Sequence, residues 1–372
     1  MKNGVTRNCA LYIVNCTFYQ KGVFAVAYTV AQILPGNKRG QAAADALLVR
    51  EGIRRDAHLD YTCGVYDDDF NLCATGSCFA NTLRCMAVDG GHQGEGLMNL
   101  VVSHLSEVQA ARGNTHLFLY TKPASAKFFG DLGFYEIARV PDKLVFMENR
   151  RAGFTDWLKA QKRADAPRER TAAVVMNANP FTLGHRFLLE KACESADAVH
   201  LFVLSEDFGP IPAADRKRLV AAGTADMEKI ILHDSGPYII SAATFPGYFL
   251  KDSDEVSLAH ARLDLAVFGR IAEALNIGAR FVGEEPFSHV TGLYNRAMTE
   301  ELPRLGVACR VIPRLETGGK AVSASMVRQA VHDGDMESVR PWLPQSTWAY
   351  LTGPDGEKAV AAIRRSDDVI HH

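Results

Sequence analysis

A run of ten residues, 176–185 (MNANPFTLGH), holds residue types that can handle a phosphate group. The apolar residues 171–175 before it predict a buried strand, and residues 183–194 predict a helix. The run therefore lies where a strand leads into a helix N-terminus, whose unpaired amides and dipole attract anions. Gly184 lets the backbone approach a ligand. His185 adds a donor that can follow negative charge as it develops on a phosphate.

A second run, 322–328 (VSASMVR), lies far along the chain at the start of another predicted helix. Ser323 and Ser325 can cap this helix and hydrogen-bond phosphate oxygens, and Arg328 can neutralise a departing pyrophosphate. Either run alone is a moderately specific signal for a nucleotide-handling site. Together, in this order around strands and helices, they predict a nucleotide-handling site at the carboxyl ends of parallel strands.

We expect Thr182 and His185 to flank the phosphates of the ligand, and Pro180 to shape the turn before them. The catalytic residues are then His185, Thr182 and Arg328. Gly283 and Glu284 end a predicted strand on the same edge of the sheet, and Asn295 is expected near them. The residues expected to bind the nucleotide are Asn177, Asn179, Phe181, Gly184, Arg216, Gly283, Glu284, Ser323 and Ser325.

The composition of the 372 residues is that of a globular protein, with 47% hydrophobic and 23% charged residues. The net charge of −2, without a lysine- or arginine-rich run, argues against nucleic acid as a partner. The apolar run 22–34 is too short to span a bilayer. Its length also suits the apolar core of a signal peptide, but it contains a predicted strand, so we expect a cytoplasmic protein without a membrane partner.

Eight cysteines are present, and four of them cluster in stretches that predict strands. The gaps between Cys63, Cys73, Cys78 and Cys85 match no zinc-binding pattern. We interpret them as thiols of a hydrophobic core in a reducing compartment.

The predicted elements divide the chain into two domains. Residues 23–147 alternate strands and helices in an order that predicts an α+β domain. After the polar segment 161–170 (QKRADAPRER), strands and helices alternate regularly, which predicts a Rossmann-like, doubly wound α/β domain with a parallel sheet. The expected boundaries are 1–150 for the first domain, 151–170 for a linker, 171–352 for the second domain and 353–372 for a tail. The strands expected in the second domain are 171–176, 199–204, 229–233, 280–283 and 307–312, with a long helix over 254–276.

The first run resembles the T/H-x-G-H signature of the adenylyl- and cytidylyltransferase superfamily, and 322–328 resembles the second phosphate motif of that superfamily. Three further stretches resemble the citrate lyase ligase family: 175–185 (VMNANPFTLGH), 241–251 (SAATFPGYFLK) and 280–287 (RFVGEEPF). The resemblance covers roughly residues 40 to 350. We have no physical account of the task of 244–251.

The resemblance implies an enzyme that activates acetate with ATP as acetyl-adenylate and releases pyrophosphate. It would then acetylate the thiol of the phosphoribosyl-dephospho-CoA arm on the acyl carrier subunit of citrate lyase, which switches that enzyme on. Acetate is ionised at neutral pH, so no general base is required. Mg²⁺ would accompany ATP, held mostly by phosphates and water. No acidic pair is spaced so that we can name it as a metal ligand.

Two features depart from the nucleotidyltransferase pattern. Thr182 takes the first position of the H-x-G-H form, where threonine also occurs in relatives. After the second strand, where many relatives place a phosphate-binding lysine, residues 205–207 read Ser-Glu-Asp. The second cationic partner of the triphosphate is therefore open. Arg216 resembles the arginine that opens the next helix in relatives and is one candidate; the alternative is a solvated arginine on a helix face.

In the first domain, a predicted strand over 83–88 is followed by the glycine-rich segment 90–96 (GGHQGEG) and an amphipathic helix. This resembles the Q/R-x-x-G-x-G/A signature of GNAT acyltransferases, with Met98 in place of the usual small residue. The resemblance implies that Gln93, Gly94 and Gly96 bind the CoA-like arm. A fold kept for structure alone is the alternative. We expect His92 and His104 to be exposed, and both are weak candidates for a catalytic base.

Two other functions share the phosphate motifs. One is an adenylyltransferase that acts on a phosphomonoester in cofactor synthesis; the other is a nucleotide-sensing protein without activity. The family-like stretches favour the ligase. We expect a division of labour in which the second domain makes acetyl-adenylate and the first holds the arm. A fragment starting near Asp165 would then keep ATP–pyrophosphate exchange and lose thiol acetylation.

Overall fold

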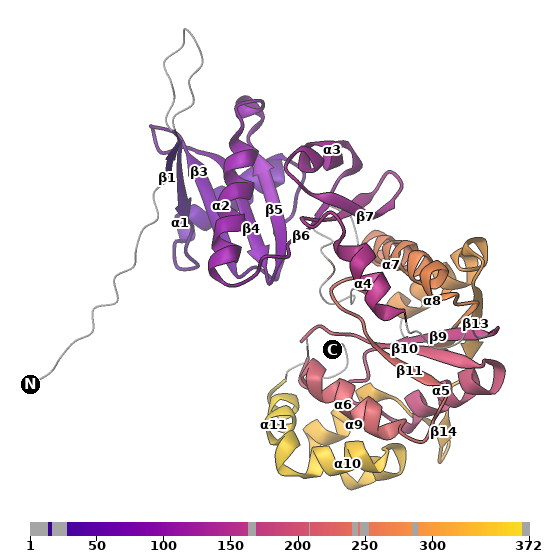
Figure 1. Ribbon diagram of the computed structural model, residues 1–372. Coiled ribbons are helices and arrows are strands. Elements are labelled where there is room, and N and C mark those ends of the chain that lie inside the picture. The colour runs from indigo at the N-terminus through magenta and orange to yellow at the C-terminus, as the bar shows by residue number, and fades with distance from the viewer. Residues whose placement is uncertain are drawn as a thin grey trace, which may run out of the picture. The chain divides into compact units, whose positions relative to one another are not determined.

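The computed structural model describes residues 14–16, 28–162, 169–207, 209–239, 245, 253–284 and 289–366 (Figure 1). These residues form two compact units. The first unit extends to Arg151 and the second begins at Ala152. Each unit has its own sheet and its own hydrophobic core.

The sheet of the first unit has the strand order β1-β2-β3-β4-β5-β6-β8-β7. All neighbouring strands are antiparallel except β5 and β6, which are parallel. The strands are β1 (Val14–Cys16), β2 (Tyr28–Gln32), β3 (Tyr61–Tyr66), β4 (Leu72–Phe79), β5 (Thr82–Val88), β6 (Phe118–Thr121), β7 (Tyr135–Val140) and β8 (Leu144–Glu148).

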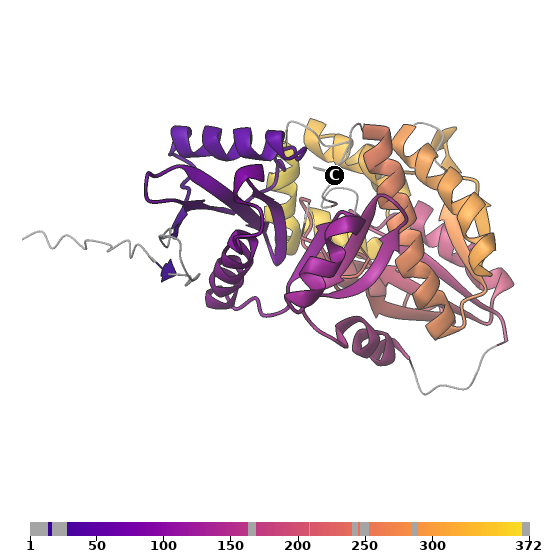
Figure 2. The same cartoon turned by 90° about the horizontal axis from the view of Figure 1, so that it is seen from above.

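Helices cover both faces of this sheet. Helix α1 (Lys38–Arg50) buries Leu47 and Leu48 against Cys85 and Ala87 of β5. Helices α2 (Leu97–Ala111) and α3 (Pro123–Asp131) pack on the other face, in the larger core of the unit. Figure 2 shows α1 and α2 on opposite sides of the strands. The α+β architecture expected for the first domain is confirmed.

The second unit contains a five-stranded, fully parallel sheet of order β11-β10-β9-β12-β13. The chain adds strands on one side of β9 and then returns to add β12 on the other side, so β9 and β12 form the switch point of a doubly wound sheet. The fold class predicted from the alternation is confirmed. The strands are β9 (Thr171–Met176), β10 (Ala198–Val203), β11 (Ile230–Asp234), β12 (Ala279–Gly283) and β13 (Ala308–Ile312).

One face of this sheet packs against a group of helices, two of which begin at the phosphate-type runs. They are α5 (Leu183–Ser195), α6 (Ala213–Gly223), α9 (Ala324–Asp333), α10 (Gln345–Thr352) and α11 (Glu357–Arg365), whose apolar residues join one core with the strands. Helix α7 (Ser253–Leu275) packs against α4 (Gly153–Gln161) and α8 (His289–Glu301). A short hairpin, β14 (Glu316–Thr317) and β15 (Lys320–Ala321), precedes α9.

Two segments differ from the expected boundaries. Residues 153–161, expected in a linker, form α4, because Phe154 is buried and packs against Tyr238 with the ring centres 4.9 Å apart. Residues beyond 352, expected as a tail, include α11, which buries Ala359 and Ile363. Residues 163–168 and 367–372 lie outside the described part of the chain.

The four clustered cysteines are buried in the first unit, as the interpretation as core thiols requires. Burial raises the pKa of the Cys63 thiol to about 12. Among the described residues, no helix is both long and apolar enough to cross a membrane. The cytoplasmic location stays a prediction.

Candidate functional site

The first run forms the turn between β9 and α5, with Thr182 as the N-cap of the helix. The Thr182 hydroxyl accepts a hydrogen bond from the His185 amide at 3.4 Å, and the Thr182 amide donates to His185 Nδ1 at 3.1 Å. This reciprocal capping satisfies two amides of the first turn. Because Nδ1 accepts, a neutral His185 ring carries its hydrogen on Nε2.

The charge state of His185 follows from its surroundings. Burial, with a further contribution from the Arg314 guanidinium, lowers the pKa of His185 to about 4. The Phe181 ring stacks beside the imidazole with the ring centres 5.8 Å apart. His185 is therefore a neutral hydrogen-bond donor near pH 7.

The second run caps α9. The Ser323 hydroxyl accepts from the Met326 amide at 3.2 Å and lies 3.1 Å from the Ser325 hydroxyl. Both serines are thus held at a helix N-terminus, where an anion is favoured.

The structure brings the two runs together. A Cβ atom at Gly184 would lie 2.9 Å from the carbonyl oxygen of Val322, so the first turn of α5 approaches the backbone before α9 closely. Arg328 is 3% exposed and donates through Nη1 to the Asn179 carbonyl at 2.6 Å. Arg328 thus fixes the first run; its contact with pyrophosphate stays a prediction.

Arg216 is not a solvated arginine on a helix face. Its side chain is 1% exposed, and it donates to the carbonyls of Asn177, Glu206 and Ile211 and to the Asn177 side chain, over 2.5–3.2 Å. Burial lowers the pKa of Arg216. The residue joins the turn after β9 to the loop after β10, and a direct nucleotide contact stays a prediction.

Asn179 has an unusual environment. Its side chain is 2% exposed, and neither its amide nitrogen nor its amide oxygen has a hydrogen-bond partner within the described structure. A buried polar group without a partner is costly. A ligand that reaches this turn would meet an amide with unused hydrogen-bonding capacity.

The position after β10 holds no lysine. Instead, the Ser205 hydroxyl donates to the Asp234 carboxylate at the end of β11, and the same carboxylate pairs with Lys217 of α6 at 3.0 Å. Lys217 is therefore already paired at this edge.

The ends of β12 and β13 complete the carboxyl edge of the sheet. Gly283 and Glu284 are exposed, and the Asn295 side chain lies 3.4 Å from the Gly283 carbonyl. Arg314, which sequence reasoning missed, follows β13 and donates through Nε to the Glu284 carbonyl at 2.9 Å. The sequence feature that could have pointed to Arg314 is its position just after a strand of the parallel sheet.

In the first unit, the glycine-rich segment forms a short turn before α2. Gly94 and Gly96 have φ of 88° and 76°, and Gly96 is the N-cap of α2 without a side-chain hydrogen bond to the helix. Gln93 is exposed beside them. The segment thus presents a helix N-terminus, which favours anions. Binding of the CoA-like arm at this segment stays a prediction.

The two histidines of this unit differ. His92 is half-buried and lies 3.2 Å from both the Glu95 carboxylate and the Tyr28 hydroxyl. His104 is 8% exposed and bonds the Tyr61 hydroxyl at 2.7 Å. The expectation that His104 is exposed is wrong, because it lies on the buried face of α2.

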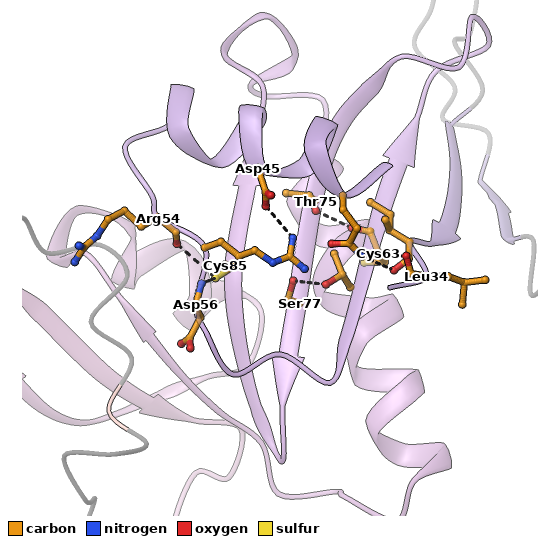
Figure 3. Close-up of polar contacts among 12 residues, drawn as sticks. Leu34, Asp45, Arg54, Asp56, Cys63, Thr75, Ser77 and Cys85 are labelled. Atoms are coloured by element: carbon orange, nitrogen blue, oxygen red, sulfur yellow. Dashed lines mark hydrogen bonds and ion pairs between the residues drawn. The ribbon is translucent and has the colours of Figure 1, made fainter. Parts of the chain in front are cut away.

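Strands β5 and β6 pair only through Thr82 and Leu83. Further along, β5 bulges: Cys85 has a φ of 49° and the register with β4 shifts. Figure 3 shows Cys85, whose sulfur accepts from the Asp56 amide at 3.3 Å and donates to the Arg54 carbonyl at 3.8 Å. These contacts hold the bulge where β5 leaves β6.

Solved structures similar to this chain include a putative acyl-CoA N-acyltransferase from Klebsiella pneumoniae, 17% identical, with a TM-score of 0.29, covering 32% of this chain and 95% of that one. A putative nicotinate-nucleotide adenylyltransferase from Vibrio parahaemolyticus is 16% identical, with a TM-score of 0.31, covering 53% of this chain and 96% of that one.

Sequence relatives are much closer. A citrate (pro-3S)-lyase ligase from Klebsiella pneumoniae is 39% identical over 285 residues, covering 75% of this chain and 83% of the relative. The protein of the same name from Escherichia coli (strain K12) is 36% identical, covering 80% and 87%. The family model of the citrate lyase ligase C-terminal domain matches residues 171–351. The chain belongs to the citrate lyase ligase family.

Proposed function

We propose that this member of the citrate lyase ligase family activates acetate with ATP and transfers the acetyl group to a CoA-like arm on the acyl carrier subunit of citrate lyase. The observation that carries the adenylation step is the contact between the two phosphate-type runs. Arg328 holds the Asn179 carbonyl, and Gly184 lies against the Val322 carbonyl. Two helix N-termini and the His185 donor therefore serve one anion site.

In the first half-reaction, an acetate oxygen bonds to the α-phosphorus of ATP and the bond from that phosphorus to the pyrophosphate oxygen breaks. Negative charge grows on the nonbridging oxygens. His185 Nε2–H and the amides at the start of α5 are suited to receive that charge, and they need no proton transfer. Positioning and electrostatics supply most of the acceleration.

The described residues contain no group of three or more His, Cys, Asp or Glu side chains that could hold a metal ion. Mg²⁺ accompanying ATP would be held mostly by phosphate oxygens and water. The unpartnered Asn179 amide is in keeping with a polar ligand at this turn.

In the second half-reaction, the thiolate sulfur of the arm bonds to the acetyl carbon of acetyl-adenylate, and the bond to the AMP oxygen breaks. The first unit would hold the arm, with its diphosphate at the amides around Gly94 and Gly96. The divergence of β5 from β6 after Leu83 is in keeping with an extended arm between these strands.

The test is ATP–pyrophosphate exchange with a panel of short carboxylates and of phosphomonoesters. We expect exchange with acetate and none with phosphomonoesters. Exchange that depends on a phosphomonoester would instead support the cofactor-synthesis alternative. Binding of ATP without any exchange would support a nucleotide-sensing protein.

A further inference from the structure

We propose that Phe70, in the β3–β4 turn (residues 67–71), is the anchor residue by which the first unit docks the acyl carrier subunit that bears the CoA-like arm. The inference rests on the proposed function, because it requires the carrier as a substrate. It assigns a surface to the protein part of that substrate, beside the glycine-rich turn that would hold the diphosphate of the arm.

The exposure and the backbone of Phe70 set it apart. Among the large hydrophobic side chains that the structure describes, it is the most exposed, at 85%. Its φ of 62° lies in the left-handed region, which glycine or asparagine adopts far more readily than a bulky residue. Neither burial nor backbone preference therefore accounts for a phenylalanine at this position. An exposed aromatic ring suits contact with a partner, because aromatic residues often dominate the energy of an interface.

The β3–β4 turn is held in one shape by its own hydrogen bonds. The Asp67 carboxylate accepts from the amides of Asp69 and Asn71, at 3.0 and 2.7 Å, and from the Asn71 side chain at 3.0 Å. The Phe70 amide donates to the Asp67 carbonyl at 3.1 Å. A side chain on a turn that is already ordered costs less entropy when a partner binds it.

The β3–β4 turn and the glycine-rich turn lie at the same end of the sheet. Ala74, near the start of β4, pairs with Val88, the last residue of β5. The amide of Asp89, which immediately precedes the glycine-rich segment 90–96, donates to the Cys73 carbonyl at 2.8 Å. Because Cys73 follows closely after the turn in the chain, the two turns are neighbours.

The chemistry of the arm indicates which molecule would meet Phe70. The reactive thiol is at one end of the arm, so the carrier would be attached at the other end, through the phosphoribosyl group, with the diphosphate between them. An arm with its diphosphate at Gly94 and Gly96 and its thiol end between β5 and β6 then leads to a carrier at the end of the sheet where Phe70 lies. Residues 67–69 are aspartates, so the facing surface of the carrier should offer an apolar socket with a cationic rim.

The experiment compares Phe70→Asn and Phe70→Tyr with Tyr135→Ala in the full-length protein. Asparagine tolerates the left-handed backbone, so the turn should persist, and tyrosine keeps the ring. Tyr135 is another exposed aromatic residue, on the edge strand β7 of the same sheet. Phe70→Asn should raise the KM for the carrier roughly 10- to 100-fold, with kcat and ATP–pyrophosphate exchange retained. Phe70→Tyr and Tyr135→Ala should acetylate the carrier with a nearly normal KM.

The carrier without its arm tests the protein contact separately. It should compete with the complete carrier for the wild type, and compete much more weakly for Phe70→Asn. A normal KM for the carrier in a folded Phe70→Asn protein, an equal rise in Tyr135→Ala, or no competition by the arm-free carrier would overturn the docking surface and leave the proposed function standing. A wild-type protein that does not acetylate the carrier would overturn the proposed function, and the docking surface with it.

Discussion

At the scale of single residues, Thr182 holds the His185 ring so that only its Nε2 nitrogen can donate a hydrogen bond. Thr182 occupies Nδ1, so Nε2–H is the donor that we propose for a phosphate. Thr182 departs from a histidine at the first position of the motif, yet its hydroxyl and amide both contact His185. Its role in the structure is therefore to cap α5 and to fix the tautomer of the histidine.

His185→Ala should lower acetate-dependent ATP–pyrophosphate exchange at least about 100-fold, because it removes a donor aimed at transition-state charge. The fold should persist, as judged by circular dichroism. His332→Ala is the matched control: His332 lies in the same unit, is exposed and pairs with the neighbouring Asp333. Near-normal exchange by a folded His185→Ala protein would exclude His185 from the mechanism.

The lowered pKa of His185 predicts a pH dependence of stability. The imidazole has a pKa of about 4 in the folded protein and about 6.5 in the unfolded chain. As the pH falls from about 6.5 toward 4, the unfolded chain therefore binds a proton that the folded protein does not. His185 lowers the free energy of unfolding over this window and has no such effect above it.

The free energy of unfolding of the wild type, measured against pH with urea, should therefore fall more steeply between pH 6.5 and 4 than that of His185→Gln. Parallel profiles for the two proteins would show that His185 titrates normally in the folded state.

At the scale of elements, the close approach of α5 to the backbone before α9 depends on a missing side chain. A Cβ at Gly184 would lie 2.9 Å from a backbone carbonyl, which cannot move like a flexible side chain. Gly184→Ala should therefore separate the two runs and destabilise the protein by about 1–3 kcal/mol, with a loss of exchange. Urea unfolding and exchange assays would measure both effects.

Gly292→Ala is the control for this substitution. Gly292 lies inside α8, and nothing lies within 4 Å of a Cβ built there. The change should leave exchange intact and raise stability by about 0.5–1 kcal/mol, as alanine does in a helix interior. If Gly184→Ala behaved like Gly292→Ala, the contact with Val322 would have no importance for the site.

Most elements were predictable because their periodicity is strong and their ends are marked by caps. Strand β9 and helix α5 follow the expected limits, with Thr182 as the cap. Helix α4 was missed although Phe154, Trp157 and Leu158 lie on one helical face, because its charged continuation reads as a linker. The burial of Arg216 was not predictable, since it depends on loops that meet only in the folded sheet.

At the scale of the whole molecule, we propose that the two sheets, which have separate cores, divide two chemical tasks. The parallel sheet carries both phosphate-type runs, and the mixed sheet carries the glycine-rich turn before α2. Acetate adenylation needs only the first of these sites. Transfer to the thiol needs a place for the arm as well, so the two activities should be separable.

A fragment that spans 152–372 should retain acetate-dependent ATP–pyrophosphate exchange and lose acetylation of the carrier thiol. It must begin before α4 and not near Asp165, because α4 contributes to this unit. Phe154 is 3% exposed and lies under the Arg270 guanidinium, and Trp157 packs on Tyr238. Removal of α4 would uncover these contacts, and truncation of one buried aromatic side chain typically costs about 3–5 kcal/mol.

The comparison is therefore between the full chain, the 152–372 fragment and a 169–372 fragment. The longer fragment should unfold cooperatively and exchange pyrophosphate, whereas the shorter one should lose stability. Carrier acetylation, followed by mass spectrometry of the arm, should appear only with the full chain. Full acetylation by the 152–372 fragment would refute the division of labour, because the second unit alone would then bind the arm and complete both half-reactions.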